Sequence, residues 1–449
     1  MLMNRGYLTF MALTLALAAC SAAAGDSPTR RGIVGIIVGR PAVEGAKGVQ
    51  VTQLVIGSPA YKSELRPGDI ITHLNGKPIK STIQFANLLH RPRSGSEWQF
   101  KVRRKDHEFD LSLVAAPVPQ EQSTADVQLE YTWLRADDGV NLRGLITRPG
   151  EGVGPWPTIL ILPGLGGMPC DDRDFPMYRG LARAFTRAGY VVVRWDQRGA
   201  GDSYGDNYED VDFDTEVRDA AAVLRAVLDL EIVERWRVYV FGSALGGVVA
   251  PHVLARQTGV AGLITWATLS RPLVEYMIDV TRNQGRLAAT PAPEVNRQVR
   301  LTIRLYERLL AGDDPLELVR RHPQLRDFVG IGGYVQSKTA EFWRQLDATP
   351  YGRLYGNSTV PVLALFGEHD FVATPFDQAN IVELARAGGR NDVGALLVRG
   401  TDHEMNTVLS PAESFEKLKM REYTFNSAAV KSALDWIKKL EKSRFGKSD

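Results

Sequence analysis

The sequence predicts an α/β protein: a doubly wound, mostly parallel sheet with a helical lid insertion, preceded by a small β-rich domain. Three observations predict this fold class. From residue 127 onward, continuous apolar runs alternate with helical patterns, an order that places helices on both faces of a parallel sheet. The spacing of these runs breaks once, between Trp266 and Pro361. A polar, proline-bearing segment, 117–126, separates this region from a shorter one with many glycine turns.

Length and composition exclude several classes of protein. A chain of 449 residues is longer than one ordinary domain, and 44% hydrophobic with 24% charged residues is typical of globular proteins. A net charge of +2 gives no electrostatic reason to expect a nucleic-acid partner. Two cysteines, Cys20 and Cys170, cannot form a disulfide scaffold.

The first 19 residues have the pattern of an export signal. Arg5 precedes an apolar stretch, 6–19, that is too short to span a bilayer. Its end, Leu-Ala-Ala-Cys at 17–20, resembles the lipobox of bacterial lipoproteins. That resemblance implies a lipid anchor at Cys20 in the bacterial cell envelope, and Ser21 in place of aspartate favours the outer membrane, facing the periplasm. An ordinary secretory signal, cleaved among the alanines that follow, is the alternative.

Residues 30–116 form the predicted small domain, after a short polar tether at 26–31. Gly57-Ser58-Pro59-Ala60 precedes a segment, 65–79, that predicts a turn, a short apolar strand and a tight Asn-Gly turn into another strand. In this order the pieces resemble the PDZ domains attached to bacterial periplasmic proteases. The resemblance therefore implies a peptide-binding module.

In a PDZ domain an extended peptide adds to an open sheet edge, and backbone N–H groups of a loop bind its terminal carboxylate. By resemblance that loop consists of Ile33, Val34, Gly35 and Ile36. Gly35 would let the backbone turn toward the ligand with no side chain in the way. The alternative is a domain that serves only as a spacer or packs against its neighbour.

Residues 117–126 read as a linker and 127–443 as the second domain, with the lid at about 268–358. Helical patterns are expected at 178–188, inside the lid at 301–310 and 315–321, and after a cap at Asn426 or Ser427. Eight strands are expected, at 129–134, 140–146, 158–162, 190–195, 238–241, 262–266, 362–366 and 395–398.

The most informative motif, Gly-Ser-Ala-Leu-Gly-Gly at 242–247, lies between a strand and an apolar helix, the setting of a nucleophile elbow. With the glycine loop at 162–167 and the turn at 196–203, it resembles the α/β-hydrolase fold over about 127–440. The resemblance implies a serine hydrolase that acts by acyl transfer on carboxylic esters, with small peptides as the second substrate class. It implies no cofactor.

The centre of this elbow departs from the family. A sharp, strained turn needs small residues two positions before and after the nucleophile, and only position 244 has glycines there. Ala244 occupies this nucleophile position, so the chain is predicted to be inactive in acyl transfer. Ser243 is a poor alternative nucleophile. The residues two positions before and after it are Phe241 and Leu245, and their side chains would crowd the turn.

The remaining catalytic groups follow in the order nucleophile, acid, base. By resemblance His403 is the general base, Asp370 orients it, and the backbone N–H groups of Leu165 and Leu245 form the oxyanion hole. In the alternative, His403 is a loop residue paired with Asp402 or with the glutamate at 404.

Metal and nucleotide sites are not expected. A His-Asp pair can ligate a metal, but no third ligand has suitable spacing, and the glycine loop lacks the Lys-Ser/Thr of a phosphate-binding loop. Three functions stay open: a hydrolase with its nucleophile replaced, a non-catalytic pseudo-hydrolase that binds ligands or peptides in the cell envelope, and a protease adaptor.

Overall fold

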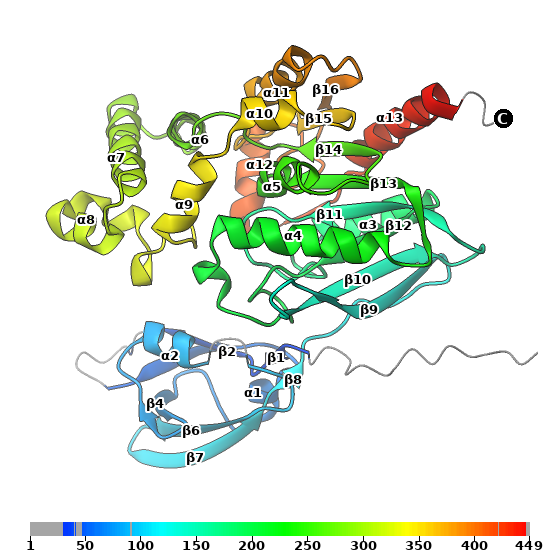
Figure 1. The fold of residues 1–449 in the computed structure, drawn as a ribbon. Coiled ribbons are helices and arrows are strands. Elements are labelled where there is room, and N and C mark those ends of the chain that lie inside the picture. The colour runs from blue at the N-terminus through cyan, green and yellow to red at the C-terminus, as the bar shows by residue number, and fades with distance from the viewer. Residues whose placement is uncertain (1–29, 40, 42–46, 90–91, 421, 446–449) are drawn as a thin grey trace, which may run out of the picture.

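The computed structural model describes residues 30–39, 41, 47–89, 92–420 and 422–445. The predicted export signal, at 1–19, and Cys20 lie outside these residues. Figure 1 shows a small β-rich domain at the N-terminal side of a larger domain in which helices cover a central sheet. Within the described part of the chain, no helix is long and apolar enough to cross a membrane.

The small domain is built on a sheet in the order β2-β3-β4-β6-β7. Asn75 and Gly76 both have positive φ, 48° and 73°, which gives the tight turn predicted between β4 and β5. The predicted peptide-binding loop at 33–36 runs from the end of β1, at Ile33, to the start of the edge strand β2, at Ile36. The bounds are β1 (Gly32–Ile33), β2 (Ile36–Gly39), β3 (Val49–Leu54), α1 (Pro59–Lys62), β4 (Ile70–Leu74), β5 (Lys77–Pro78), α2 (Thr82–Leu88), β6 (Glu97–Arg104), β7 (His107–Val114) and β8 (Ala116–Pro117).

The large domain contains the predicted eight-stranded sheet, in the order β16-β15-β14-β13-β11-β12-β10-β9. The pairs β9·β10 and β10·β12 are antiparallel and all others are parallel. The fold class predicted from the sequence is therefore confirmed. The strands are β9 (Val127–Arg135), β10 (Asn141–Pro149), β11 (Trp156–Leu162), β12 (Val191–Trp195), β13 (Val233–Ser243), β14 (Gly262–Trp266), β15 (Val362–Gly367) and β16 (Val393–Val398).

Helices cover both faces of this sheet and bury two hydrophobic clusters (Figure 1). One face packs against α4 (Phe213–Leu228), α5 (Leu245–Leu254) and α11 (Pro375–Ala387), and the other against α3 (Met177–Arg187) and α13 (Ala428–Phe445). α12 (Pro411–Met420) follows β16. Because central strands such as β12 and β14 are buried along their whole length, they read in the sequence as continuous apolar runs.

The insertion between β14 and β15 is helical, as its sequence pattern predicts. It consists of α6 (Leu273–Leu287), α7 (Ala292–Leu310), α8 (Pro315–Arg321), η2 (Pro323–Phe328), η3 (Ile331–Gly333), α9 (Ala340–Asp347) and α10 (Tyr351–Gly356). Leu273 and Met277 of α6 and Trp343 of α9 line the cavity described below.

The segment at 117–126 differs from a free linker. The Glu121 side chain is buried and forms ion pairs with Arg194, at 2.5 Å, and Arg183, at 2.9 Å. The composition of the segment predicts that the Glu121 side chain is exposed to solvent. Composition does not reveal Arg183 and Arg194, which neutralise this side chain, because they lie more than 60 residues away in the chain. The segment is therefore fixed to the large domain.

Candidate active site

The turn between β13 and α5 has the geometry of a nucleophile elbow. Ala244 lies at its tip with φ 46° and ψ −112°, a conformation that L-residues adopt only under strain. A Cβ on Gly246 would lie 2.2 Å from the Leu162 carbonyl oxygen, and one on Gly242 would lie 2.5 Å from the Gly246 carbonyl oxygen. Only glycine fits at these two positions, so the turn is as tight as the sequence predicts.

The strained conformation falls on Ala244 and not on Ser243. Ser243 is the last residue of β13, is 2% exposed, and pairs in register with Trp266 of β14. The backbone N–H of Ala244 donates to the Trp266 carbonyl, at 2.8 Å, which fixes the turn against the neighbouring strand. The residue at the strained tip of the turn is therefore an alanine, whose side chain is a methyl group.

The structure brings Asp370 and His403 together at the carboxyl ends of β15 and β16. His403 Nδ1 and Asp370 Oδ2 are 2.8 Å apart, and Asp370 Oδ1 accepts the N–H groups of Val372 and Ala373, at 2.7 and 2.8 Å. The indole N–H of Trp266 donates to the His403 carbonyl, at 2.8 Å. His403 is therefore held by Asp370, and not by the alternative partners Asp402 or the glutamate at 404.

One cavity of about 160 Å³ is bordered by the predicted catalytic residues other than Asp370. Ala244, Leu165, Leu245 and His403 all border it, and its wall is otherwise mainly apolar. Among the residues that the structure describes, no lysine or arginine lines it. The remaining lining residues are Gly164, Met168, Phe175, Met177, Tyr178, Ser243, Ala267, Leu269, Leu273, Tyr276, Met277, Gln336, Trp343, Leu346, Val372 and Glu404.

The loop after β11 lies directly over the elbow. A Cβ on Gly164 would lie 3.3 Å from the Ala244 Cβ. Two buried tyrosine hydroxyls hold this loop: Tyr178 accepts the Gly164 N–H at 2.8 Å, and Tyr208 accepts the Gly166 N–H at 3.0 Å. Among the described residues, the N–H groups of Leu165 and Leu245 have no acceptor, so both are available to an oxyanion.

His403 and its neighbour Glu404 have displaced pKa values. Burial lowers the pKa of His403, but the charge and hydrogen bond of Asp370, with Glu404 and Asp402, raise it to about 9. Burial raises the pKa of Glu404 to about 7, although His403 opposes this shift. Opposite charges next to each other in an apolar cavity favour the protonated imidazole.

Glu404 and the tyrosines Tyr178 and Tyr208 are functional candidates that the motifs did not reveal. The Glu404 side chain makes no hydrogen bond or ion pair with another described residue, whereas Asp402 accepts the Glu404 N–H at 3.1 Å and caps the turn. The only feature of the sequence that could have identified Glu404 as a site residue is its position directly after the predicted base, His403. Glu368 and His369, which directly precede Asp370 in the chain, do not border the cavity.

The small domain presents the loop expected to bind a peptide carboxylate. Gly35 has φ +87°, and a Cβ there would lie 2.1 Å from the Ser58 Oγ, so the position requires glycine. The Val34 and Gly35 carbonyls accept from Ala60 and Val55, at 3.0 and 2.9 Å. Their own N–H groups donate to no other described residue.

Comparison with known proteins supports both resemblances. A family model described as "Serine aminopeptidase, S33" (Hydrolase_4) matches residues 174–407, and a PDZ domain model matches 32–114. A probable periplasmic serine endoprotease, DegP-like, of Hahella chejuensis (strain KCTC 2396) is 32% identical over 77 residues. The mitochondrial serine protease HTRA2 of Drosophila persimilis is 42% identical over 50 residues. These matches cover 17% and 11% of this chain, and only 16% and 12% of those relatives.

Solved structures of α/β hydrolases and esterases are similar to this chain at low sequence identity. The α/β hydrolase GrgF of Penicillium sp. sh18 is 18% identical with a TM-score of 0.44, covering 69% of this chain and 98% of its own. The esterase Pf2001 of Pyrococcus furiosus is 14% identical with a TM-score of 0.44, and the match covers 72% of this chain and 96% of that one. Est1E of Butyrivibrio proteoclasticus with bound ferulic acid is 16% identical with a TM-score of 0.43, and the match covers 65% of this chain and 98% of that one. Since the Hydrolase_4 match spans more than half of the 449 residues, the chain belongs to that serine aminopeptidase S33 family of α/β hydrolases and carries a PDZ domain before it.

Proposed function

We propose that this chain is a serine ester hydrolase in architecture, with its catalytic apparatus complete except for the nucleophile at residue 244. One observation carries the proposal: His403, which is paired with Asp370, borders the same cavity as two free backbone donors and the strained elbow. With alanine at 244 no acyl-enzyme can form, so the present chain binds its substrate without turning it over.

A hydroxyl at position 244 would make this arrangement competent for acyl transfer. His403 Nε2, the ring nitrogen not bonded to Asp370, would take the hydroxyl proton as the oxygen attacks the ester carbonyl, and would deliver it to the leaving alcohol. Asp370 would stabilise the imidazolium. The N–H groups of Leu165 and Leu245 would bind the oxyanion, a contribution of about 3 kcal/mol per donor. Water would then release the acid.

The cavity supports carboxylic esters with a small apolar acyl group as substrates. Its volume of about 160 Å³ is close to that of an engineered apolar cavity, roughly 150 Å³, that binds benzene. The absence of lysine and arginine from its wall disfavours an anionic acyl group. Small peptides are the second substrate class that we propose.

Two matched proteins test the proposal: the chain with Ala244 and its Ala244→Ser variant. We expect the serine variant to hydrolyse p-nitrophenyl esters and to be labelled by a fluorophosphonate probe, and the alanine form to do neither. A serine variant that neither hydrolyses nor is labelled would refute the proposal. Ser243→Ala in the alanine form is the control, because any residual turnover that this substitution removes would identify Ser243 as a nucleophile.

A non-catalytic binding role is the second candidate, and Ala244 itself favours it. In that case the cavity binds a ligand and the PDZ domain binds peptide C-termini through the loop at 33–36. Calorimetry with peptides ending in a free carboxylate, and with the same peptides amidated, tests the second part. We expect binding of the free-carboxylate peptides alone, and equal or no binding of both sets would favour a spacer.

We also propose that the protein is held in the bacterial cell envelope by a lipid at Cys20, on the outer membrane facing the periplasm. The lipobox-like sequence at 17–20 supports this placement. Globomycin blocks the peptidase that processes lipoproteins, so we expect the unprocessed precursor to accumulate in treated cells. Unchanged processing would point to an ordinary secretory signal.

A further inference from the structure

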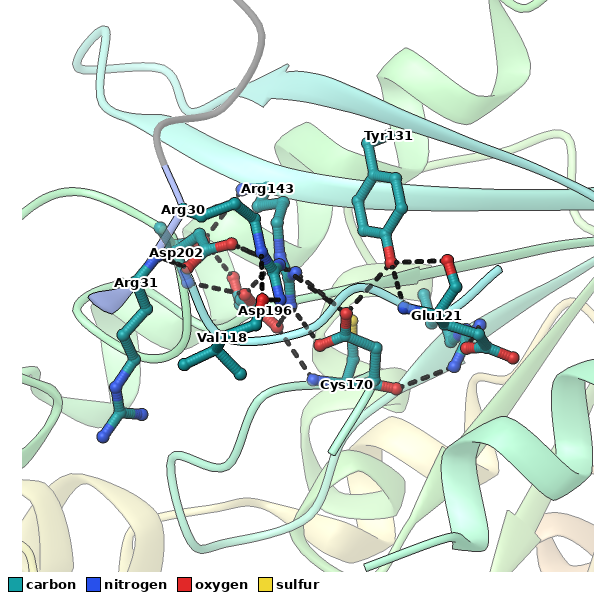
Figure 2. Close-up of polar contacts among 12 residues, drawn as sticks. Arg30, Arg31, Val118, Glu121, Tyr131, Arg143, Cys170, Asp196 and Asp202 are labelled. Carbon is teal, nitrogen blue, oxygen red and sulfur yellow. Dashed lines mark hydrogen bonds and ion pairs between the residues drawn. The ribbon is translucent and has the colours of Figure 1, made fainter. Parts of the chain in front are cut away.

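A buried group of charged side chains joins the two domains (Figure 2). This interdomain cluster consists of Arg30, Arg143, Asp171, Asp196 and Asp202. Arg143 lies at its centre: it donates to Asp196 at 2.6 and 2.9 Å and to Asp171 at 2.7 and 3.1 Å, and its Nη1 lies 3.2 Å from Asp202. No side chain of the cluster is more than 11% exposed. Loss of one charge from such a buried group leaves the others uncompensated.

Arg30 connects the cluster to the small domain. Its guanidinium pairs with Asp202 at 2.5 Å and donates to the Val118 carbonyl at 3.1 and 3.3 Å. The Arg31 backbone N–H donates to the other Asp202 oxygen at 2.5 Å. Arg30 lies just before β1 and Val118 just after β8, and these two strands pair with each other. The base of the small domain is therefore fastened to Asp202.

The opposite side of the cluster holds the loop that carries the Leu165 N–H. We call residues 163–171 the oxyanion loop. Its far end is anchored twice: the Cys170 N–H donates to Asp196 at 2.8 Å, and Asp171 binds Arg143 and accepts from the Tyr131 hydroxyl at 3.1 Å (Figure 2). The cluster therefore reaches from the small domain to the catalytic cavity.

The position of the oxyanion loop depends on such anchors, because glycines at 164, 166 and 167 give it little rigidity of its own. Gly166 and Gly167 have φ of 146° and 60°. Two tyrosine hydroxyls hold the near end of the loop, as described above, and the cluster holds the far end. Oxyanion donors stabilise a transition state only when they are already in place, so a small displacement of the loop reduces catalysis.

Arg30 also sets the charge balance. Three carboxylates in the cluster face two guanidinium groups. Burial raises the pKa of Asp202, while Arg143 and Arg30 oppose this shift. Without Arg30, Arg143 alone would face all three carboxylates and would be drawn toward Asp202, away from the two that anchor the oxyanion loop.

We propose that Arg30 is a positioning residue for the oxyanion loop, acting through Asp202 and Arg143. The docked small domain then supports stabilisation of the transition state and contributes little to substrate binding. This inference rests on the proposed ester hydrolase function of the cavity.

The first test uses the Ala244→Ser variant and adds Arg30→Met. We expect kcat to fall about tenfold while KM changes less than about twofold, and Arg30→Lys to restore part of the loss. Arg31→Met is the matched control, because the Arg31 side chain makes no hydrogen bond or ion pair with a described residue and extends away from the cluster in Figure 2. Unchanged kcat in Arg30→Met, or an equal loss in both variants, would overturn the proposal, provided that thermal unfolding shows both to be folded.

The route through Asp202 has its own test. If Arg30 acts by neutralising Asp202, then Arg30→Met has a smaller effect on kcat when Asp202→Asn has already removed the charge. We expect the double variant to lose less than the product of the two single losses. Independent, multiplicative losses would show that Arg30 does not act through Asp202.

Amide hydrogen exchange tests the inference without any catalysis. In the chain with Ala244, we expect Arg30→Met to speed exchange in peptides that cover 163–171, and Arg31→Met to leave it unchanged. If the serine variant proves inactive but exchange responds, the proposed function fails and the coupling stands. If the serine variant is active and both exchange and kcat ignore Arg30, the coupling fails alone.

Discussion

Residue 244 carries a backbone conformation that alanine adopts only at a cost of about 1 to 3 kcal/mol. The surrounding packing imposes it: the glycines at 242 and 246 leave no space for a wider turn, and the Ala244 N–H is bound to Trp266. A serine at this position needs no change of backbone. The Ala244→Ser variant is therefore a direct probe of chemistry and not of folding.

The pH dependence of that variant is predicted from His403 and Glu404. Since the pKa of His403 is about 9, the base is protonated below that pH and kcat/KM should rise as pH increases toward 9. Glu404 is ionised above about pH 7 and stabilises the imidazolium. We expect Ala244→Ser/Glu404→Gln to move the acidic limb of the kcat/KM profile down by about one pH unit.

The control for this prediction is Glu383→Gln, an exposed carboxylate on α11 that does not border the cavity. It should leave the profile where it is. A Glu404→Gln profile that coincides with that of the serine parent would show that Glu404 does not act on His403.

The candidate site was predicted from the sequence where its residues belong to motifs, and only there. Asp370 and His403 follow strands whose carboxyl ends meet at one edge of a parallel sheet, and the family resemblance, supported by chain order, predicted that they lie together. Tyr178 and Tyr208 could not be found this way. Each hydroxyl binds the oxyanion loop from 14 and 42 residues away, a contact that exists only after the helices pack.

At the scale of elements, apolar runs and alternating segments predicted all eight strands of the large sheet and a mostly parallel arrangement, but not which pairs are antiparallel. A strand buried on both faces has the same continuous apolar pattern whether its neighbours are parallel or antiparallel. The antiparallel pairing of β10 with β12 was therefore invisible. β13 begins at Val233, before the apolar run that predicted it. This early part of the strand contains Glu234, which is half-buried, and Arg235, which is exposed, so it has no apolar pattern in the sequence.

The insertion is attached to the large domain by a buried ion pair, which gives a second prediction. Lys338, fully buried, pairs with Glu216 of α4 at 2.6 Å and donates to the Tyr208 carbonyl at 2.7 Å. Lys338→Met leaves the Glu216 charge unpaired, so we expect a loss of at least about 3 kcal/mol in the free energy of unfolding, measured with urea.

Two comparisons isolate the cause of that loss. Lys338→Met/Glu216→Leu removes both charges and should recover most of the stability. Lys431→Met removes an exposed lysine paired with Asp435 and should change stability by less than about 1 kcal/mol. An equal loss in the single and double variants would assign the effect to packing and not to charge.

The elbow glycine gives a third prediction, about α5. In Gly246→Ala the new Cβ would overlap the Leu162 backbone, which cannot yield without moving β11. We expect a loss of about 2 to 3 kcal/mol in urea unfolding. Gly394→Ala in β16 is the matched control, since a Cβ there has no atom within 4 Å. Similar small losses in both would mean that the elbow relaxes.

For the whole molecule, the segments on either side of the small domain matter more than their composition suggests. Both read as polar connectors in the sequence, yet each inserts one charged side chain into the large domain: Arg30 before β1 and Glu121 after β8. Their partners, Asp202 and Arg194, follow or belong to β12. Long-range ion pairs leave no local pattern, which is why the two domains were predicted and their attachment was not.

The connection after β8 gives the last prediction. Arg194 is 1% exposed on its side chain, and it also donates to the Cys170 carbonyl in the oxyanion loop at 2.8 Å. Glu121→Gln removes the carboxylate that neutralises it, and we expect urea unfolding of the full chain to show a loss of about 3 kcal/mol. Glu130→Gln on the exposed side of β9 is the matched control and should change stability by less than about 0.5 kcal/mol. If the two variants unfold alike, the ion pairs of Glu121 contribute little to stability, and the contacts with Asp202 and Ser203 account for the attachment of the small domain.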